Sequence, residues 1–391
     1  MIDYLNQANA MFDYTQNLRR DFHKHPELGF QEVRTSGIVA RELTELGLEV
    51  STGIAVTGVV GLLDTGRPGP TVLLRFDMDA LPIHEETGIE FASQNPGVMH
   101  ACGHDGHTAA GLTVARLLKD SIERLSGKVK FVFQPAEEGL GGAEKMLTEG
   151  VLQNPRPDSI LTLHVWNEKP LGWLGITPGP VMAAAGIFNV RIIGKGGHGA
   201  GPHLAVDPIL TSAHVITALQ SIVSRNVPPL ETAVVSVTAV QGGEAFNVIP
   251  PEVELKGTIR TFDPEVRLKV IDRFQQVVNG VAEGMGCQAE IEMNSITPAV
   301  INDPTITARV QNTAAGLLPD CEIDTAATTM GSEDMAFLMR DVPGCYIFVG
   351  SSNSDKGLDA AHHNPAFNFD ERALPMGAAL LAAATTELLN D

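Results

Sequence analysis

The sequence has 391 residues, of which 43% are hydrophobic and 19% are charged, a composition typical of a globular protein. Two domains are expected at this length, because a single core rarely grows so large. The formal net charge of −20 repels phosphate backbones, so nucleic acid is excluded as an expected partner. The sequence contains no apolar run long enough for a membrane span and no signal-peptide pattern, so we expect a cytoplasmic protein.

The first part of the chain alternates predicted helices with predicted strands, which indicates an α/β fold. Two amphipathic helices are expected at 4–24 and 32–47, separated by the turn His25–Phe30 with its Pro26 and Gly29. Strands are then expected at 56–63, 71–76, 128–133 and 159–165, with helices at 108–119 and from the glycines at 139–142 through 149.

The stretch Met99–His107 concentrates one thiol, three imidazoles and one carboxylate in nine residues. Cys102 and His104 flank a single glycine, and in a loop this spacing lets both side chains turn toward one point. A thiolate and an imidazole together suit a transition ion such as zinc. The alternative is a histidine-rich surface loop without a ligand.

Carboxylates follow two of the predicted strands. Asp77 and Asp79 are two residues apart, so on a strand they point the same way, and burying them requires a cationic partner. Glu137 and Glu138 come directly after Pro135, which ends the strand 128–133. Open α/β sheets bind ligands at such strand ends. The alternative for both pairs is a solvated turn.

Histidines complete a candidate metal-binding set. His164 lies near the end of the strand 159–165, where a lone histidine is more often a core residue, and His362 and His363 are adjacent in a polar loop. Together with Cys102, His104 and the glutamates, these residues would supply enough nitrogen, oxygen and sulfur ligands for two first-row ions sharing a bridging water.

The organisation changes near Pro178–Pro180, and the region 182–293 follows the order strand, helix, strand, strand, helix, strand. This order predicts a ferredoxin-like domain. Its elements are expected at 185–193, 206–225, 232–241, 252–261, 264–284 and 287–293. Strand and helix alternation resumes afterwards, at 305–317, 345–349 and 371–389. The region therefore looks like an insertion that divides a catalytic domain into 1–181 and 294–391.

The sequence resembles a family of di-metal amidohydrolases and peptidases. This family includes hippurate hydrolases, N-acyl-amino-acid amidohydrolases, N-acetyl-diaminopimelate deacetylases and the plant auxin–amino acid conjugate hydrolases. The resemblance rests on the segments His23–Phe30, Asp77–Pro82, Met99–His107, Gln134–Gly139, Gly194–His203, Asn247–Pro250 and Gly331–Asp334. It implies a central mixed sheet flanked by helices, with an inserted ferredoxin-like domain that serves as lid and dimerisation domain.

The resemblance also implies roles for individual residues. The family's metal ligands fall on Cys102, His104, Glu138, His164 and His363. His363 is preferred to His362, because Pro365 follows it two residues later, as in the family's His-x-Pro loop. Glu137 corresponds to the general base and Asp79 to a carboxylate that orients the centre. Asp77 stands where many related peptidases have a ligand histidine, so Cys102 is expected to bridge or cap the second ion. Zinc, manganese, cobalt and nickel all suit this set.

Within the inserted domain, the resemblance places His198 over the scissile carbonyl, often from the partner subunit of a homodimer. Arg260 and Asn247 are then expected to bind the free carboxylate of the substrate. Domain closure is expected around hinges at Pro178–Val181 and Met293–Pro298.

The resemblance therefore implies an enzyme that hydrolyses N-acyl-L-amino acids through a metal-activated water. The alternatives are a carboxypeptidase or dipeptidase with the same centre and, from another class, a non-catalytic metal- or ligand-binding protein. The general base argues against the last alternative, because a binding site needs no base beside its ligands. The sequence leaves open the metal, the acyl group and the amino acid.

Overall fold

The computed structural model describes residues 2–390, which form two compact units. Unit 1 comprises the described residues up to Val181 together with Ile301–Thr328 and the described residues from Asp334 onward. Unit 2 comprises Met182–Val300 and Thr329–Glu333. The chain leaves unit 1 within strand β7 (Gly179–Met182) and returns to it within strand β14 (Val300–Asn302).

Unit 1 is built on an eight-stranded mixed sheet with the order β1-β2-β4-β3-β5-β16-β6-β15. The strands are β1 (Glu49–Ile54), β2 (Gly58–Asp64), β3 (Thr71–Asp77), β4 (Lys128–Gln134), β5 (Ser159–Pro170), β6 (Trp173–Gly175), β15 (Glu322–Asp324) and β16 (Gly344–Ser352). The four central strands, β4, β3, β5 and β16, run parallel. Their carboxyl ends therefore meet at one edge of the sheet, where Asp77 is in register with Gln134.

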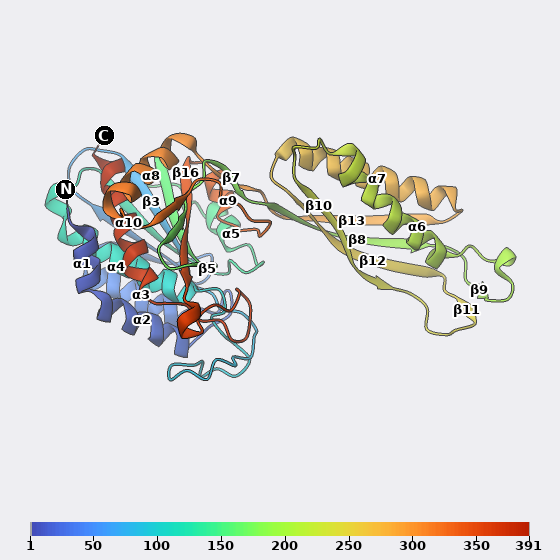
Figure 1. The fold of residues 1–391 in the computed structure, drawn as a ribbon, viewed down its shortest axis with the longest axis horizontal. Coiled ribbons are helices and arrows are strands. Elements are labelled where there is room, and N and C mark those ends of the chain that lie inside the picture. The colour runs from blue at the N-terminus through green and yellow to red at the C-terminus, as the bar shows by residue number, and fades with distance from the viewer. Residues whose placement is uncertain (1, 391) are drawn as a thin grey trace. The chain divides into compact units, whose positions relative to one another are not determined.

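Helices flank this sheet (Figure 1). They are α1 (Tyr4–Ala10), α2 (Phe12–Lys24), α3 (Val33–Glu45), α4 (His104–Asp120), α5 (Gly142–Thr148), α8 (Pro304–Leu317), α9 (Ala336–Met339) and α10 (Ala373–Leu389). Helices α4 and α10 pack against each other and against the central strands. The predicted fold class, α/β with a central mixed sheet flanked by helices, is confirmed.

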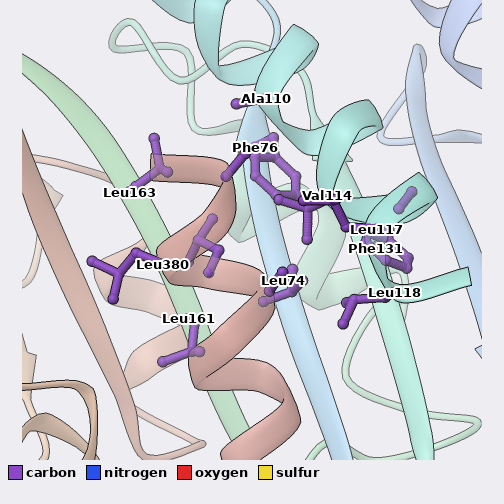
Figure 2. Close-up of a cluster of buried hydrophobic side chains, with 14 of the residues drawn as sticks. Leu74, Phe76, Ala110, Val114, Leu117, Leu118, Phe131, Leu161, Leu163 and Leu380 are labelled. Atoms are coloured by element: carbon purple, nitrogen blue, oxygen red, sulfur yellow. The ribbon is translucent and has the colours of Figure 1, made fainter. Parts of the chain in front are cut away.

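Figure 2 shows the core between α4, α10 and the strands. Alternate residues of a strand face the same side, so Leu74 and Phe76 of β3 pack on this face with Leu161 and Leu163 of β5. Helix α4 contributes Ala110, Val114, Leu117 and Leu118, and α10 contributes Leu380. Gly111 lets α4 approach closely, because a Cβ there would lie 2.7 Å from the Phe76 ring. This packing fixes the first turn of α4 against the carboxyl edge of the sheet.

Unit 2 has the order β8, α6, β10, β12, α7, β13 along the chain and an antiparallel sheet with the spatial order β10-β12-β8-β13. This is the ferredoxin-like arrangement. Helices α6 and α7 pack on one face of the sheet (Figure 1). The bounds are β8 (Ala184–Ile193), α6 (Pro208–Ser221), β10 (Ala233–Gln241), β12 (Glu252–Thr261), α7 (Pro264–Gly284) and β13 (Gln288–Thr297), and a two-residue pair joins β9 (Gly197–His198) to β11 (Val248–Ile249).

Several element predictions were wrong in detail. The single helix expected at 4–24 is two helices, because the chain breaks at Met11. Helix α4 begins at His104, four residues before the expected start, and β5 continues to Pro170. Strand β13 continues to Thr297, so most of the expected hinge Met293–Pro298 is paired strand. The short strands β1, β6 and β15 were missed. Among the described residues, no helix is both long and apolar enough to span a membrane.

Candidate metal centre

The turn that leads into α4 brings the first two predicted ligands together. Gly103 has φ 92° and is the N-cap of α4, so Cys102 precedes the helix and His104 is its first residue. A Cβ at Gly103 would lie 2.3 Å from Cγ2 of Val165 on β5. Only glycine therefore fits at position 103, between Cys102 and His104. The expectation that both residues lie in a loop was wrong for His104.

All five predicted ligands converge at the carboxyl edge of the sheet in unit 1. Their donor atoms form overlapping groups in which every pair of atoms lies within 4.8 Å. These groups are Cys102, His104 and His164; Cys102, Glu138 and His363; and His104, Glu137 and Glu138. Residues from segments as distant as Cys102 and His363 thus share one small volume beside Glu137.

Hydrogen bonds orient the two inner imidazoles in the same way. His104 donates from Nδ1 to the Asp79 carbonyl at 2.9 Å and lies 3.2 Å from Asp79 Oδ1. His164 donates from Nδ1 to the Val165 carbonyl at 2.6 Å. In both rings Nε2 remains as the acceptor, and His164 Nε2 lies 3.5 Å from Cys102 Sγ. An imidazole held through one nitrogen presents the other as a metal ligand.

The two adjacent histidines of the last loop point to different partners. His362 Nε2 accepts a hydrogen bond from the Asn167 amide at 3.1 Å. His363 Nε2 lies 3.2 Å from Glu138 Oε1, and the pKa of His363 is raised to about 10 by Cys102 and Glu138. His363 has φ 65°, a left-handed conformation that is strained for a histidine and that accompanies many functional sites. His362 Nδ1 also lies 3.8 Å from Cys102 Sγ, so the preference for His363 over His362 stays a prediction.

The glutamate pair sits on a constrained turn. Ala136 immediately before it has φ 56°, and its amide donates to Glu32 Oε1 at 2.9 Å. Glu32 Oε2 in turn accepts from the Thr57 hydroxyl at 2.5 Å. The Glu138 amide donates to Asp79 Oδ2 at 3.0 Å. Asp79 therefore contacts both the His104 ring and the glutamate turn. The sequence did not predict that Glu32 holds this turn.

Two further buried residues lie directly behind the centre. His107 donates from Nδ1 to Asp77 Oδ1 at 2.6 Å, and the other oxygen of Asp77 accepts from Arg75 at 2.7 Å. His107 was not among the predicted site residues. The available signal was its spacing from His104, since residues three apart on a helix share a face.

A buried ionic network supports the first turn of α4 from the other side. Asp105 accepts from Arg19 and from the His23 ring, both at 2.8 Å. Arg19 also reaches Glu371 at 3.1 Å. All these contacts involve residues more than 80 positions apart in the sequence, which is why no local pattern predicted them.

Burial is the largest cause of the pKa shifts of His164, His362 and Cys102. Desolvation and the nearby His107 ring lower the pKa of His164. The same two causes lower that of His362 to about 3. Burial, followed by the nearby Glu138 carboxylate, raises the pKa of the Cys102 thiol. A group of buried acceptors of this kind is stabilised when a cation binds, because the cation favours the thiolate and the neutral imidazole.

The donor set fits a metal cation. The buried atom His104 Nε2 has no hydrogen-bond partner among the described residues, and such an atom is costly unless a ligand satisfies it. The other groups around it, the Cys102 thiol, the His164 imidazole and the carboxylates of Glu137 and Glu138, all bind cations through a free lone pair. Mixed nitrogen, sulfur and oxygen ligands of this type suit divalent first-row ions.

The predicted catalytic residue His198 and the two predicted substrate-binding residues, Asn247 and Arg260, lie in unit 2. His198 is exposed on β9, and its Nδ1 accepts from the Ala200 amide at 3.0 Å. Asn247 is exposed immediately before β11. Arg260 is half-buried on β12, where it donates to the Ile259 carbonyl at 3.2 Å. Within the described part of unit 2 no hydrogen bond joins these three residues, and their placement over the centre stays a prediction.

Arg267 of α7 accompanies Arg260. Its Nη2 donates to the Ala185 carbonyl at 3.1 Å, and Ala185 is paired with Arg260 across the sheet. Its Nη1 is buried without a hydrogen-bond partner, and neither arginine forms an ion pair within the described residues. Burial and the charge of Arg260 lower the pKa of Arg267. Two close, unneutralised guanidinium groups suit an oxyanion, and Arg267 was missed by sequence reasoning.

Comparison with known proteins places these observations in a family. The sequence profile of peptidase family M20/M25/M40 matches residues 73–387. IAA-amino acid hydrolase ILR1-like 4 of Arabidopsis thaliana is 42% identical, over 98% of this chain and 88% of its own length. N-acetylcysteine deacetylase of Bacillus subtilis is 41% identical over 94% of both chains. Thermostable carboxypeptidase 1 of Saccharolobus solfataricus is 38% identical over 96% of both.

A solved structure shares the whole architecture. A dinuclear metal binding peptidase of the M20 family from Bacillus subtilis superposes with a TM-score of 0.86 at 37% identity. The match covers 98% of this chain and 99% of that one.

Proposed function

Because the chain belongs to peptidase family M20/M25/M40, we propose that it is a metal-dependent hydrolase that cleaves the amide bond of N-acyl-L-amino acids. The observation that carries this proposal is the convergence of thiol, imidazole and carboxylate donors beside Glu137. A relative 41% identical is named for removing an acetyl group from cysteine, and another, 42% identical, for hydrolysing IAA–amino acids. Both names describe an acyl group joined to an amino acid.

The proposed ligands are Cys102, His104, Glu138, His164 and His363, which would hold two divalent ions, as the dinuclear centre of the Bacillus subtilis peptidase supports. Bound there, the ions would supply Lewis-acid polarisation of the amide carbonyl and lower the pKa of water. The chain's own contribution is to hold the donors at one point, with Asp79 fixing both the His104 ring and the glutamate turn.

Glu137 is the proposed general base. Its carboxylate lies within 4.8 Å of the donor atoms of His104 and Glu138, and it is only partly buried, so water and substrate can reach it. Glu137 would take a proton from the attacking water and pass it to the nitrogen of the departing amino acid. The strained conformation of Ala136, held by Glu32, would fix the direction of this carboxylate.

Arg260 and Arg267 support a substrate with a free carboxylate. Both guanidinium groups lack an acidic partner within unit 2, and an arginine pair binds a carboxylate through several parallel hydrogen bonds. We assign this role to Arg260, Arg267 and Asn247 as part of the proposal. The homodimer and the placement of His198 over the scissile bond are likewise proposed, on the family resemblance alone.

A carboxypeptidase acting on unblocked peptides is the second candidate, favoured by the 38% identical relative from Saccharolobus solfataricus. The two candidates share the centre and differ in the group on the nitrogen side of the scissile bond. A panel of substrates that separates the two candidates contains N-acetyl- and N-benzoyl-amino acids, their C-terminal carboxamides, and unblocked dipeptides. Each is assayed with zinc, manganese, cobalt or nickel added back after chelation.

We expect turnover of the acyl-amino acids, weaker turnover of their carboxamides, and dependence on added metal. Glu137→Gln should retain metal and lose turnover by several orders of magnitude, because it keeps the shape of the site without a base. Glu144→Gln, an exposed glutamate on α5, is the matched control and should match the unmodified chain. Turnover by Glu137→Gln near the control rate contradicts the mechanism, and a preference for dipeptides selects the second candidate.

A further inference from the structure

Asp77 and His107 form a fully buried pair that the proposed centre does not use. Both side chains are essentially inaccessible to solvent, at 1% and 0% exposure. Their donor atoms, with that of His104, lie within 4.8 Å of one another and could in principle hold an ion. The hydrogen bonds of His107 argue against that use and point to a different one.

Both ring nitrogens of His107 are already engaged by the protein. Nδ1–H donates to Asp77 Oδ1 at 2.6 Å, and Nε2 accepts from the Val165 amide at 2.9 Å. A nitrogen that accepts from a backbone N–H carries no proton and offers no lone pair to a cation. Asp77 therefore fixes the tautomer of His107, and His107 is left with one function, as an acceptor for β5.

The amide that His107 holds belongs to the residue that orients His164. The Val165 carbonyl accepts from His164 Nδ1 at 2.6 Å, so amide and carbonyl of one residue link His107 to the His164 ring. Val165 also fills the space beside Gly103, between Cys102 and His104. A shift of Val165 would therefore change the distances among Cys102, His104 and His164 together.

Asp77, at the other end of this series of contacts, is held by further hydrogen bonds. Arg75 donates to Asp77 Oδ2 at 2.7 Å and to Gln134 Oε1 at 2.8 Å, and the Thr108 hydroxyl donates to the Asp77 carbonyl at 2.9 Å. Asp77 is thereby tied to β3, to the end of β4 and to α4. Every group in this frame is buried, so water does not compete for these hydrogen bonds.

We propose that His107 is a positioning residue: held in one tautomer by Asp77, it fixes Val165 and so the orientation of His164 in the metal centre. This inference rests on the proposed function only in taking His164 as a ligand. It also assigns a role to the aspartate at position 77, whose partner is the imidazole of His107 rather than the ion.

The test compares variants that differ in their reach toward Val165. In His107→Gln the side-chain oxygen can approach the position of Nε2 and accept from the Val165 amide, whereas in His107→Asn it is too short to do so. His107→Leu fills the space without an acceptor. Affinity for zinc is measured by competition with a chelator, and the cobalt-loaded chain is examined by visible absorption, which reports the geometry of thiolate and imidazole ligands.

We expect His107→Asn and His107→Leu to weaken one of the two metal sites by about 10- to 100-fold and to alter the cobalt spectrum. His107→Gln should restore both toward those of the unmodified chain. Equal affinities and spectra for the Gln and Asn variants would overturn the inference, and this contrast remains available if the Leu variant does not fold. An unmodified chain that binds both ions but hydrolyses no amide would refute the proposed function and leave this inference standing.

Discussion

Arg19 offers a test of the buried network beneath α4. Its side chain is 0% exposed and contacts Asp105 at 2.8 Å and Glu371 at 3.1 Å. Arg20 contacts the same Glu371 at 2.6 Å but is 37% exposed. The neighbouring arginines thus share a partner and differ in burial, which makes Arg20→Met a matched control for Arg19→Met.

The two substitutions should differ strongly in their effect on the free energy of unfolding. Burial raises the pKa of Asp105, but Arg19 and His23 together hold it well below its usual range, so Asp105 is a charged group in a dry environment. Arg19→Met leaves that charge with His23 as its remaining close ionic partner, and breaking a buried pair in this way costs about 3–5 kcal/mol. Arg20→Met removes a partly solvated pair, which contributes about 1 kcal/mol or less.

Thermal unfolding of the chelated chain measures this difference without a contribution from bound metal. For a domain of this size, about 1 kcal/mol corresponds to roughly 2 °C, so Arg19→Met should lower the Tm by about 6–10 °C and Arg20→Met by about 2 °C. Differential scanning fluorimetry with a calorimetric check is sufficient. Equal decreases for the two variants would refute the reasoning, because burial would then not decide the cost.

Two other predictions concern the last loop and the segment after it. His363→Ala should release one of two bound ions on metal analysis, whereas His362→Ala, whose Nε2 faces the Asn167 amide, should retain both; the reverse pattern would exchange their roles. Hydrogen bonds from Arg372, opposed by burial, lower the pKa of Asp370. Its stabilising effect is complete above pH about 4 and is lost as the pH falls through its lower folded-state pKa. The destabilisation of Asp370→Asn by about 2 kcal/mol at pH 7 should therefore shrink toward pH 3 in urea denaturation, and a constant difference would contradict this assignment.

The hydrophobic pattern was sufficient for most of the elements. Strand β3 is a short run that is buried at every position and helix α4 is a longer, mostly buried run, and local sequence sets both lengths. The glycines and prolines marked the turns. The short strands β1, β6 and β15 were missed because three to six residues carry too little pattern, and they are strands only because a neighbour pairs with them.

Local sequence also identified the kinds of residue that converge at the centre, since Cys102, His104 and the glutamate pair are adjacent to breaks between elements. It did not establish that they meet. His363 reaches Glu138 because β16 lies beside β5 and returns the chain to the same edge, and that adjacency depends on the whole sheet.

The supporting residues were decided by tertiary structure alone. Arg19 and Glu32 look like ordinary residues of the predicted helices, and His107 ends the stretch Met99–His107, but nothing within a few positions of any of the three indicates the group that it contacts. Their roles arise from hydrogen bonds to Asp105, Ala136 and Val165, which lie 86, 104 and 58 positions away. The residue type alone determines which donor atom a ligand offers to a metal. The orientation of that ligand depends on buried groups that contact it only after the chain has folded.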